Sequence, residues 1–217
     1  MSGTGGAGVT GTDNLKGEPP HPMNIFDLSY QLQGDSLPLP YAPALWTALL
    51  GHWPALGDGP AGVGVVPLRG AQQHGRLWLA RRTRLVLRLP EAWCSAATQL
   101  CQQRLEGDDL HLTVGALLDQ RPLSAAPSLH AQAVRGPCDE LTFLDWAGQQ
   151  LHDLGIEGQL ICGRAQAPDA RGSTMRSLVV HHLRPDHALQ LQQVGLGPER
   201  HLGHGLFVPC KTIPNLN

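Results

Sequence analysis

The chain has 217 residues, of which 41% are hydrophobic, and its formal net charge is −2. This length fits one large domain or two small ones with a real hydrophobic core. No apolar run is long enough to span a membrane, and the near-neutral charge gives no overall sign of nucleic-acid binding. The five scattered cysteines contain no CxxC pair, which disfavours a zinc site or a disulfide framework and fits a reducing cytoplasm.

The N-terminal half shows a tail followed by alternating strand and helix patterns. Segment 1–22 is rich in Gly, Thr and Pro and lacks the basic and apolar regions of a signal peptide, so we expect a disordered tail. The apolar spacing then predicts strands and helices in turn. The strands are expected at 25–32, 63–68, 76–89 (a long strand or one with a kink near Arg81) and 110–114, and the helices at 43–53 and 90–105.

The same order of elements recurs after Pro127. Strands are predicted at 129–134, 158–163, 174–183 and 206–208, and helices at 139–152 and 185–194. The order β-α-β-β-α-β therefore occurs twice, which predicts an α+β fold of two tandem ferredoxin-like units with antiparallel sheets. We place an N-terminal ferredoxin-like domain at 23–124 and a C-terminal one, with a glycine-rich loop, at 125–217.

The glycine-rich loop lies between the last helix and the last strand. Its eleven residues from Gly195 to Gly205 include four glycines, one arginine and two histidines. Glycine adopts positive φ freely, and successive exposed N–H groups in such a loop can bind an anion. The alternative is a long turn with no ligand.

Arginine is concentrated in one part of the chain. Seven arginines and a single acid, Glu91, lie between Arg69 and Arg104. On a regular strand Arg82, Arg84 and Arg88 share one face, opposite the leucines. This face is either solvated or binds phosphate, for which the planar guanidinium is well suited.

Several motifs together resemble a known family. They are the closing stretch GLGPERHLGHGLFVPCK, Leu28-Ser29-Tyr30, Leu37-Pro38, Pro67-Leu68-Arg69-Gly70 and the segment RLVLRLP at 84–90. This set, within roughly residues 23–211, resembles the CRISPR-associated repeat-RNA-processing endoribonucleases of the RAMP superfamily (the sixth Cas family), MYXAN subtype. The resemblance implies a metal-independent cut by the RNA 2′-hydroxyl, which leaves 2′,3′-cyclic phosphate and 5′-hydroxyl ends. It also implies a product-bound enzyme in a type I CRISPR effector complex, with no cofactor and no membrane.

Such a reaction needs a base, an acid and positive charge near the phosphate. Relatives often carry a catalytic histidine on or beside the first helix, and His52 lies in the last turn of the predicted one. Tyr41, just before that helix, stands where MYXAN relatives tend to have His, and a phenol is a poor base at neutral pH. The catalytic candidates are therefore His52 and Tyr41, with His204 as a further base. The alternative readings are a helix-end histidine and a packed tyrosine.

The expected RNA-binding residues come from the arginine cluster, the predicted strand at 174–183 and the glycine-rich loop with its following strand. They are Arg82, Arg84, Arg88, Arg176, Gly195, Gly197, Arg200, His201, Gly203, His204, Gly205 and Lys211. No residue is assigned to a metal.

Two other functions remain open at this point. The departure at Tyr41 fits a catalytically inactive RAMP subunit that binds or caps guide RNA without cutting it. The near-neutral net charge fits a ferredoxin-like module that binds a small molecule or a protein.

Overall fold

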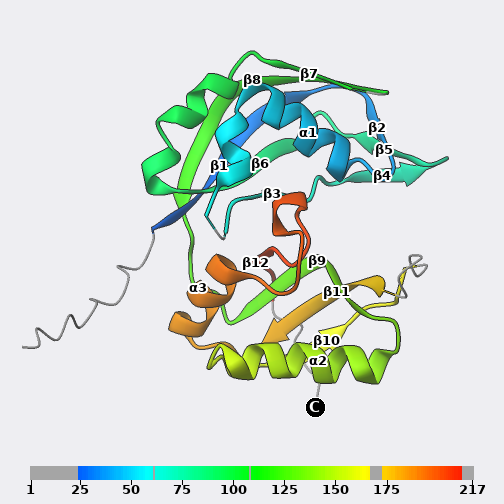
Figure 1. The fold of residues 1–217 in the computed structure, drawn as a ribbon, viewed down its shortest axis with the longest axis vertical. Coiled ribbons are helices and arrows are strands. Elements are labelled where there is room, and N and C mark those ends of the chain that lie inside the picture. The colour runs from blue at the N-terminus through cyan, green and yellow to red at the C-terminus, as the bar shows by residue number, and fades with distance from the viewer. Residues whose placement is uncertain (1–23, 61, 108, 167–172, 212–217) are drawn as a thin grey trace, which may run out of the picture.

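The structure is a computed structural model that describes residues 24–60, 62–107, 109–166 and 173–211. The tail expected at 1–22 lies outside these ranges. No helix within them is both long and apolar enough to cross a membrane. Two α+β units are stacked one above the other (Figure 1), and each contains its own hydrophobic core.

The first unit is built on a five-stranded antiparallel sheet. Its strand order is β3-β6-β1-β8-β7. Leu28, Tyr30, Leu85 and Leu87 are buried on neighbouring strands, as the alternation of apolar residues predicts. The strands are β1 (Ile25–Gln33), β3 (Gly64–Val66), β6 (Arg84–Pro90), β7 (Arg104–Gly107) and β8 (Leu110–Pro122), and helix α1 (Ala42–His52) is followed by the short 3-10 turn η1 (Pro54–Asp58).

A small three-stranded sheet extends from this unit. Its order is β2-β5-β4, with strands β2 (Ser36–Pro38), β4 (Gly70–Gln73) and β5 (Arg76–Leu79). The β4–β5 hairpin projects away from the body of the molecule (Figure 1). The strand expected at 76–89, either regular or with a kink near Arg81, is thus two strands in two sheets. They are separated by a turn in which Thr83 N–H donates to the Ala80 carbonyl and Ala80 N–H to the Thr83 hydroxyl.

The second helix expected at 90–105 does not form. The segment makes two 3-10 turns, η2 (Glu91–Trp93) and η3 (Ala96–Leu100), and Leu105 lies in β7. Side chains of Thr98 and Gln99 donate to the carbonyls of Ser95 and Ala96, three residues back. Such local bonds compete with the helical pattern, which explains the difference.

The second unit follows the expected element order. Its four-stranded antiparallel sheet has the order β10-β11-β9-β12. The elements are β9 (Ser128–Pro137), α2 (Glu140–Asp153), β10 (Gln159–Cys162), β11 (Ser173–His181), α3 (Pro185–Val194), the 3-10 turn η4 (Arg200–Leu202) and β12 (Phe207–Pro209). Both sheets share one strand order when β7 is set aside, so the predicted tandem ferredoxin-like fold is confirmed. The domain boundaries at 22/23 and 124/125 stay a prediction.

Arg88 ties the two units together. Its side chain is fully buried and donates from Nε and Nη2 to the Asp27 carboxylate at 2.8 and 2.9 Å. Its Nη1 donates to the carbonyls of Gln192 and Phe207 at 3.0 and 2.9 Å, on α3 and β12 of the other unit. The expectation that Arg88 contacts RNA is therefore wrong, because its donors point at protein acceptors inside the junction.

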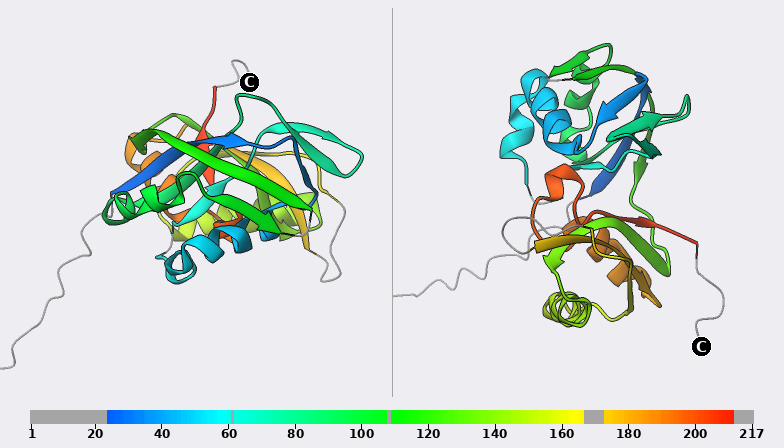
Figure 2. Two further views of the ribbon diagram at one scale, coloured as in Figure 1. Left: turned by 90° about the horizontal axis from the view of Figure 1, so that it is seen from above. Right: turned by 90° about the vertical axis from the view of Figure 1, so that its right-hand side faces the viewer.

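The turn η4 also bridges the units. Figure 2 shows it rising from the second unit toward the first. Leu202 packs against the core of the first unit, although it belongs to the second in sequence. The junction is therefore formed by both buried polar bonds and apolar packing.

Candidate functional site

The glycine-rich loop is folded tightly against the protein. The N–H groups of Gly195, Gly203 and Gly205 donate to the carbonyls of Leu191, Arg200 and Ala133. A phosphate-binding nest built from these three groups, as the sequence suggested, is therefore not available. The loop functions first as a structural element that docks one unit on the other.

Glycine is required where this loop meets β3. Gly203 has φ 90°, and a Cβ at this position would lie 2.6 Å from the Val65 carbonyl oxygen. Real Cβ atoms do not approach an oxygen so closely, so any side chain here would push η4 off β3. The close approach brings the polar part of the loop, 197–201, against α1.

A cleft of about 420 Å³ lies between the loop and the first helix, and we call it the loop cleft. Trp46 and Leu50 of α1 line one side, and Gly197, Arg200 and His201 line the other. His201 is exposed, with its ring centroid 5.2 Å from that of Trp46 and the planes at 50°. The structure thus brings three of the predicted loop residues together in one concave site.

A charged network supports the loop next to this cleft. The Glu199 carboxylate accepts from Arg135 Nε at 2.8 Å and lies 3.1 Å from His204 Nδ1. Burial favours the neutral ring and lowers the pKa of His204, although the Glu199 carboxylate opposes this shift. Burial alone would raise the pKa of Glu199, but the bond and charge of Arg135 outweigh it and the pKa is lowered. Glu199 is therefore an anion and His204 a neutral imidazole near pH 7.

The ring of His204 has a defined tautomer in this network. An ionised carboxylate only accepts hydrogen bonds, so Nδ1 of a neutral His204 carries the proton. Its Nε2 then carries the lone pair and is an acceptor. This is the state in which a histidine can take up a proton from a substrate hydroxyl.

The two predicted catalytic residues lie apart from each other. Tyr41 precedes α1 and its hydroxyl accepts a bond from Leu68 N–H at 2.8 Å, while burial raises its pKa. His52 ends the helix, is exposed, and its Nε2 lies 2.8 Å from the Arg104 carbonyl oxygen. A rise of 1.5 Å per residue separates them by roughly 16 Å along the helix axis. Neither lines the loop cleft.

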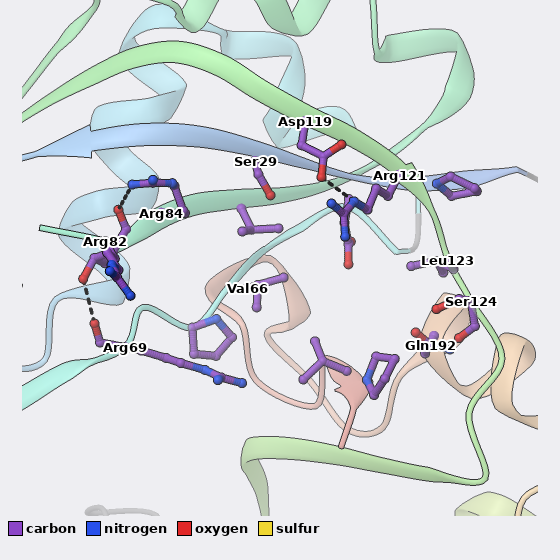
Figure 3. Close-up of a pocket in the computed structure, with 17 residues that line it drawn as sticks. Ser29, Val66, Arg69, Arg82, Arg84, Asp119, Arg121, Leu123, Ser124 and Gln192 are labelled. Carbon is purple, nitrogen blue, oxygen red and sulfur yellow. Dashed lines mark hydrogen bonds and ion pairs between the residues drawn. The ribbon is translucent and has the colours of Figure 1, made fainter. Parts of the chain in front are cut away.

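A second cleft, of about 450 Å³, lies between the two sheets, and we call it the arginine cleft. Figure 3 shows Arg69, Arg82 and Arg84 on one side of it and Arg121 with Asp119 on the other. Two of these, Arg82 and Arg84, are among the predicted RNA-binding residues. Arg69 and Arg121 were missed, although Arg69 belongs to the arginine cluster visible in the sequence.

Two predicted RNA-binding residues, Arg176 and Lys211, lie in neither cleft. Arg176 is buried, donates to the carbonyls of Gly163 and Cys138 at 3.1 and 2.8 Å, and lies over the Phe143 ring. Its assignment to RNA is wrong, because the guanidinium holds the second unit together. Lys211 is exposed after β12 and keeps its predicted role as a proposal.

The comparisons with known proteins agree with this architecture. A family model described as "Cas6 Crispr" matches residues 26–212. The chain is 33% identical over 191 residues to the CRISPR-associated endonuclease Cas6 of Myxococcus xanthus (strain DK1622), an alignment that covers 86% of this chain and 82% of that protein.

Solved structures share the fold at low sequence identity. A Cas6-related protein from Pyrococcus furiosus matches with a TM-score of 0.53 at 12% identity, over 86% of this chain and 98% of that one. A CRISPR-associated protein Cas6 matches with a TM-score of 0.54 at 9% identity, over 88% and 100%. With the family match over most of the sequence and the shared fold, this chain belongs to the Cas6 family of CRISPR-associated proteins.

Proposed function

We propose that this chain is a metal-independent endoribonuclease that binds the stem-loop of CRISPR repeat RNA and cuts the precursor into guide RNA. Membership of the Cas6 family and 33% identity to a CRISPR-associated endonuclease support CRISPR RNA processing. We further propose that the products carry 2′,3′-cyclic phosphate and 5′-hydroxyl ends. The enzyme then stays on its product with other subunits of a type I effector complex in the cytoplasm.

The observation that carries the chemistry is the loop cleft, where the imidazole of His201 and the guanidinium-bearing Arg200 line one concave surface. In the proposed reaction His201 takes the proton of a ribose 2′-hydroxyl. The 2′-oxygen then bonds to the adjacent phosphorus, and the bond from phosphorus to the 5′-oxygen breaks. Arg200 stabilises the extra negative charge that develops on the phosphoryl oxygens.

The leaving 5′-oxygen needs a proton, and the imidazolium formed on His201 can return one to it. A second candidate for the base that takes the 2′-hydroxyl proton is the neutral ring of His204. Its Nδ1 is held by Glu199, so the ring cannot rotate freely and its Nε2 is the exchanging atom. The predicted roles of His52 and Tyr41 remain rival proposals, to be tested beside these two. Their positions outside the loop cleft make them the weaker candidates.

The arginine cleft gives the proposed enzyme a way to hold RNA. Arg69, Arg82 and Arg121 present charged side chains at its surface, and A-form RNA is recognised mainly through its backbone and shape. Binding through such phosphate contacts weakens as salt increases. RNA binding would then take place in the arginine cleft and cleavage in the neighbouring loop cleft.

The first prediction tests the chemistry with repeat RNA in the presence of EDTA. We expect the wild-type chain to cut it, and His201→Ala to lower the single-turnover rate by about 10²–10⁴-fold while RNA affinity stays within a few-fold. His52→Ala tests the rival candidate, and we expect it to cut as wild type because it removes an exposed histidine at the far end of α1. Full activity in His201→Ala together with an inactive His52→Ala would return the base to His52.

A second function has one specific observation in its favour. Tyr41 occupies the position where MYXAN relatives tend to have His, and its hydroxyl is already bonded to Leu68 N–H. This fits a RAMP subunit that binds or caps guide RNA without cutting. Stable binding of repeat RNA with no turnover across neutral and mildly alkaline pH would establish that alternative.

A further inference from the structure

The β4–β5 hairpin presents a large aromatic side chain to solvent. In the described part of the chain, three large hydrophobic side chains are exposed: Trp78 at 46%, Leu118 at 50% and Leu141 at 73%. Trp78 lies in the middle strand of the small sheet, on the hairpin that projects from the molecule (Figure 1). An indole that is half exposed on a sheet face, rather than packed beneath it, needs a reason.

The residues beside Trp78 are small. Ala71 stands directly opposite it on β4, and Ser36 stands opposite on β2. Side chains directly opposite in a sheet are those that would cover a ring, and these two are too short to do so. Neither of these two neighbours covers the indole, which is 46% exposed.

The chain segment that carries Trp78 is basic and polar rather than apolar. From residue 69 to residue 84 the chain contains five arginines and no acid. Gln72, Gln73 and His74 at the tip are all exposed. A protein partner would call for a wider apolar patch, whereas a single ring among cationic and amide groups matches one base of a polyanion.

The hairpin is continuous with the arginine cleft. Arg69 immediately precedes β4, and Arg82 follows β5 in the turn that leads to β6; both line that cleft. Arg76 shares the face of Trp78 and is held by Ser36 and Asp109. A strand whose phosphates lie in the arginine cleft thus has an aromatic surface beside its path.

We propose that Trp78 is a stacking site for an unpaired base of RNA whose backbone occupies the arginine cleft. The inference rests on the proposed RNA-binding function and adds a subsite for a nucleobase. Every base has a π-face, so the contact tolerates any sequence. It requires that the base be unpaired, because a base within a stem is already stacked.

The test compares two probes of equal charge at low salt, a short oligoadenylate and the same oligomer with abasic sugars. Trp78→Ala should weaken oligoadenylate binding about tenfold, and Trp78→Phe should retain most of the affinity because it keeps a ring. Neither change should alter binding of the abasic oligomer. Leu141→Ala, which removes an exposed apolar side chain from α2, is the matched control and should bind as wild type.

Indole fluorescence provides an independent readout. Oligoadenylate should quench part of the tryptophan emission of the wild-type chain, and Trp78→Phe should lose that part. Equal affinity of the wild type and Trp78→Ala for oligoadenylate would overturn the inference, as would an equal loss for both oligomers. If the wild type cuts repeat RNA but Trp78→Ala binds oligoadenylate as wild type, only the stacking inference is rejected. If Trp78 stacks on the base but repeat RNA stays uncut, only the endonuclease activity is rejected.

Discussion

The carboxylate of Glu199 holds two side chains of the loop region at once. It accepts from Arg135 and orients the ring of His204, while His201 adds a further positive charge nearby when protonated. Burial outweighs the attraction of Glu199 and lowers the pKa of His204. The folded protein therefore favours the neutral ring more than the unfolded chain does.

This shift predicts a pH dependence of stability. Above the unfolded pKa of about 6.5 the ring is neutral in both states, and the contribution to stability is fully present. As the pH falls below that value, the unfolded chain binds a proton first and the free energy of unfolding decreases until the lower folded pKa is passed. His204→Gln should lack this component, which urea unfolding between about pH 5 and 7 will show.

The control for this measurement is His52→Gln, which removes a histidine from the exposed end of α1. It should keep the acid-linked loss of the wild type. An identical pH profile for wild type and His204→Gln would show that the ring is not coupled to folding.

Arg84 and Arg88 show what an alternating sequence pattern can and cannot predict. The alternation in 84–89 correctly separates arginines from leucines, and Arg84 lines a cleft as expected of an exposed charge. Arg88 has the same parity and is buried, because the second unit covers that end of the strand. Alternation along a strand shows which residues share a face, but the tertiary packing decides whether solvent or protein covers that face.

At the level of elements, the loop between α3 and β12 depends on its close approach to β3. Gly203 meets the Val65 carbonyl, and a Cβ on Gly205 would overlap the carbonyl of Leu196. The sequence indicated a glycine-rich loop at the right place. It gave no means to distinguish glycines that bind a ligand from glycines that permit packing.

The variants Gly203→Ala and Gly75→Ala together separate two contributions to the loss of stability, backbone strain at positive φ and overpacking of a new Cβ. Both positions have positive φ, but a Cβ on Gly75, at the hairpin tip, would have open space. Gly75→Ala should cost about 1–2 kcal/mol through backbone strain. Gly203→Ala should lose about 1–3 kcal/mol more from overpacking against β3.

Chemical denaturation of the two variants measures this difference. Gly203→Ala should also lower RNA cleavage, because η4 carries Arg200 and His201. Equal losses of stability in the two proteins would mean that the loop moves aside at little cost.

The second helix of the first unit is an element that the sequence predicts and the structure does not form. Trp93, Ala97 and Leu100 have helical spacing, and Ala97 and Leu100 are indeed buried. The 3-10 turns place these residues against the core equally well, since they also repeat about every third residue. Apolar spacing therefore predicted the buried side chains correctly and the hydrogen-bond pattern wrongly.

For the whole molecule, the guanidinium of Arg88 is the main polar link between the units. Arg88→Met would leave the Asp27 carboxylate and the carbonyls of Gln192 and Phe207 without their donor. We expect the free energy of unfolding to fall by about 3–5 kcal/mol. Arg121→Met, which breaks the exposed pair with Asp119, should cost at most about 1 kcal/mol.

Urea unfolding of both variants checks this difference. The double change Arg88→Met with Asp27→Leu should recover part of the loss, because it removes the unpaired charge. A loss of less than about 1 kcal/mol in Arg88→Met would show that water replaces the guanidinium without difficulty.

The strand β3 sets the distance between the loop cleft and the arginine cleft. Val63, just before it, borders the loop cleft, and Val66, at its end, borders the arginine cleft. Three residues of extended chain span about 10 Å. If one RNA strand occupies both clefts, β3 fixes the distance between the nucleotides bound in the arginine cleft and the bond that is cut. That spacing is then set by the protein rather than by the repeat sequence.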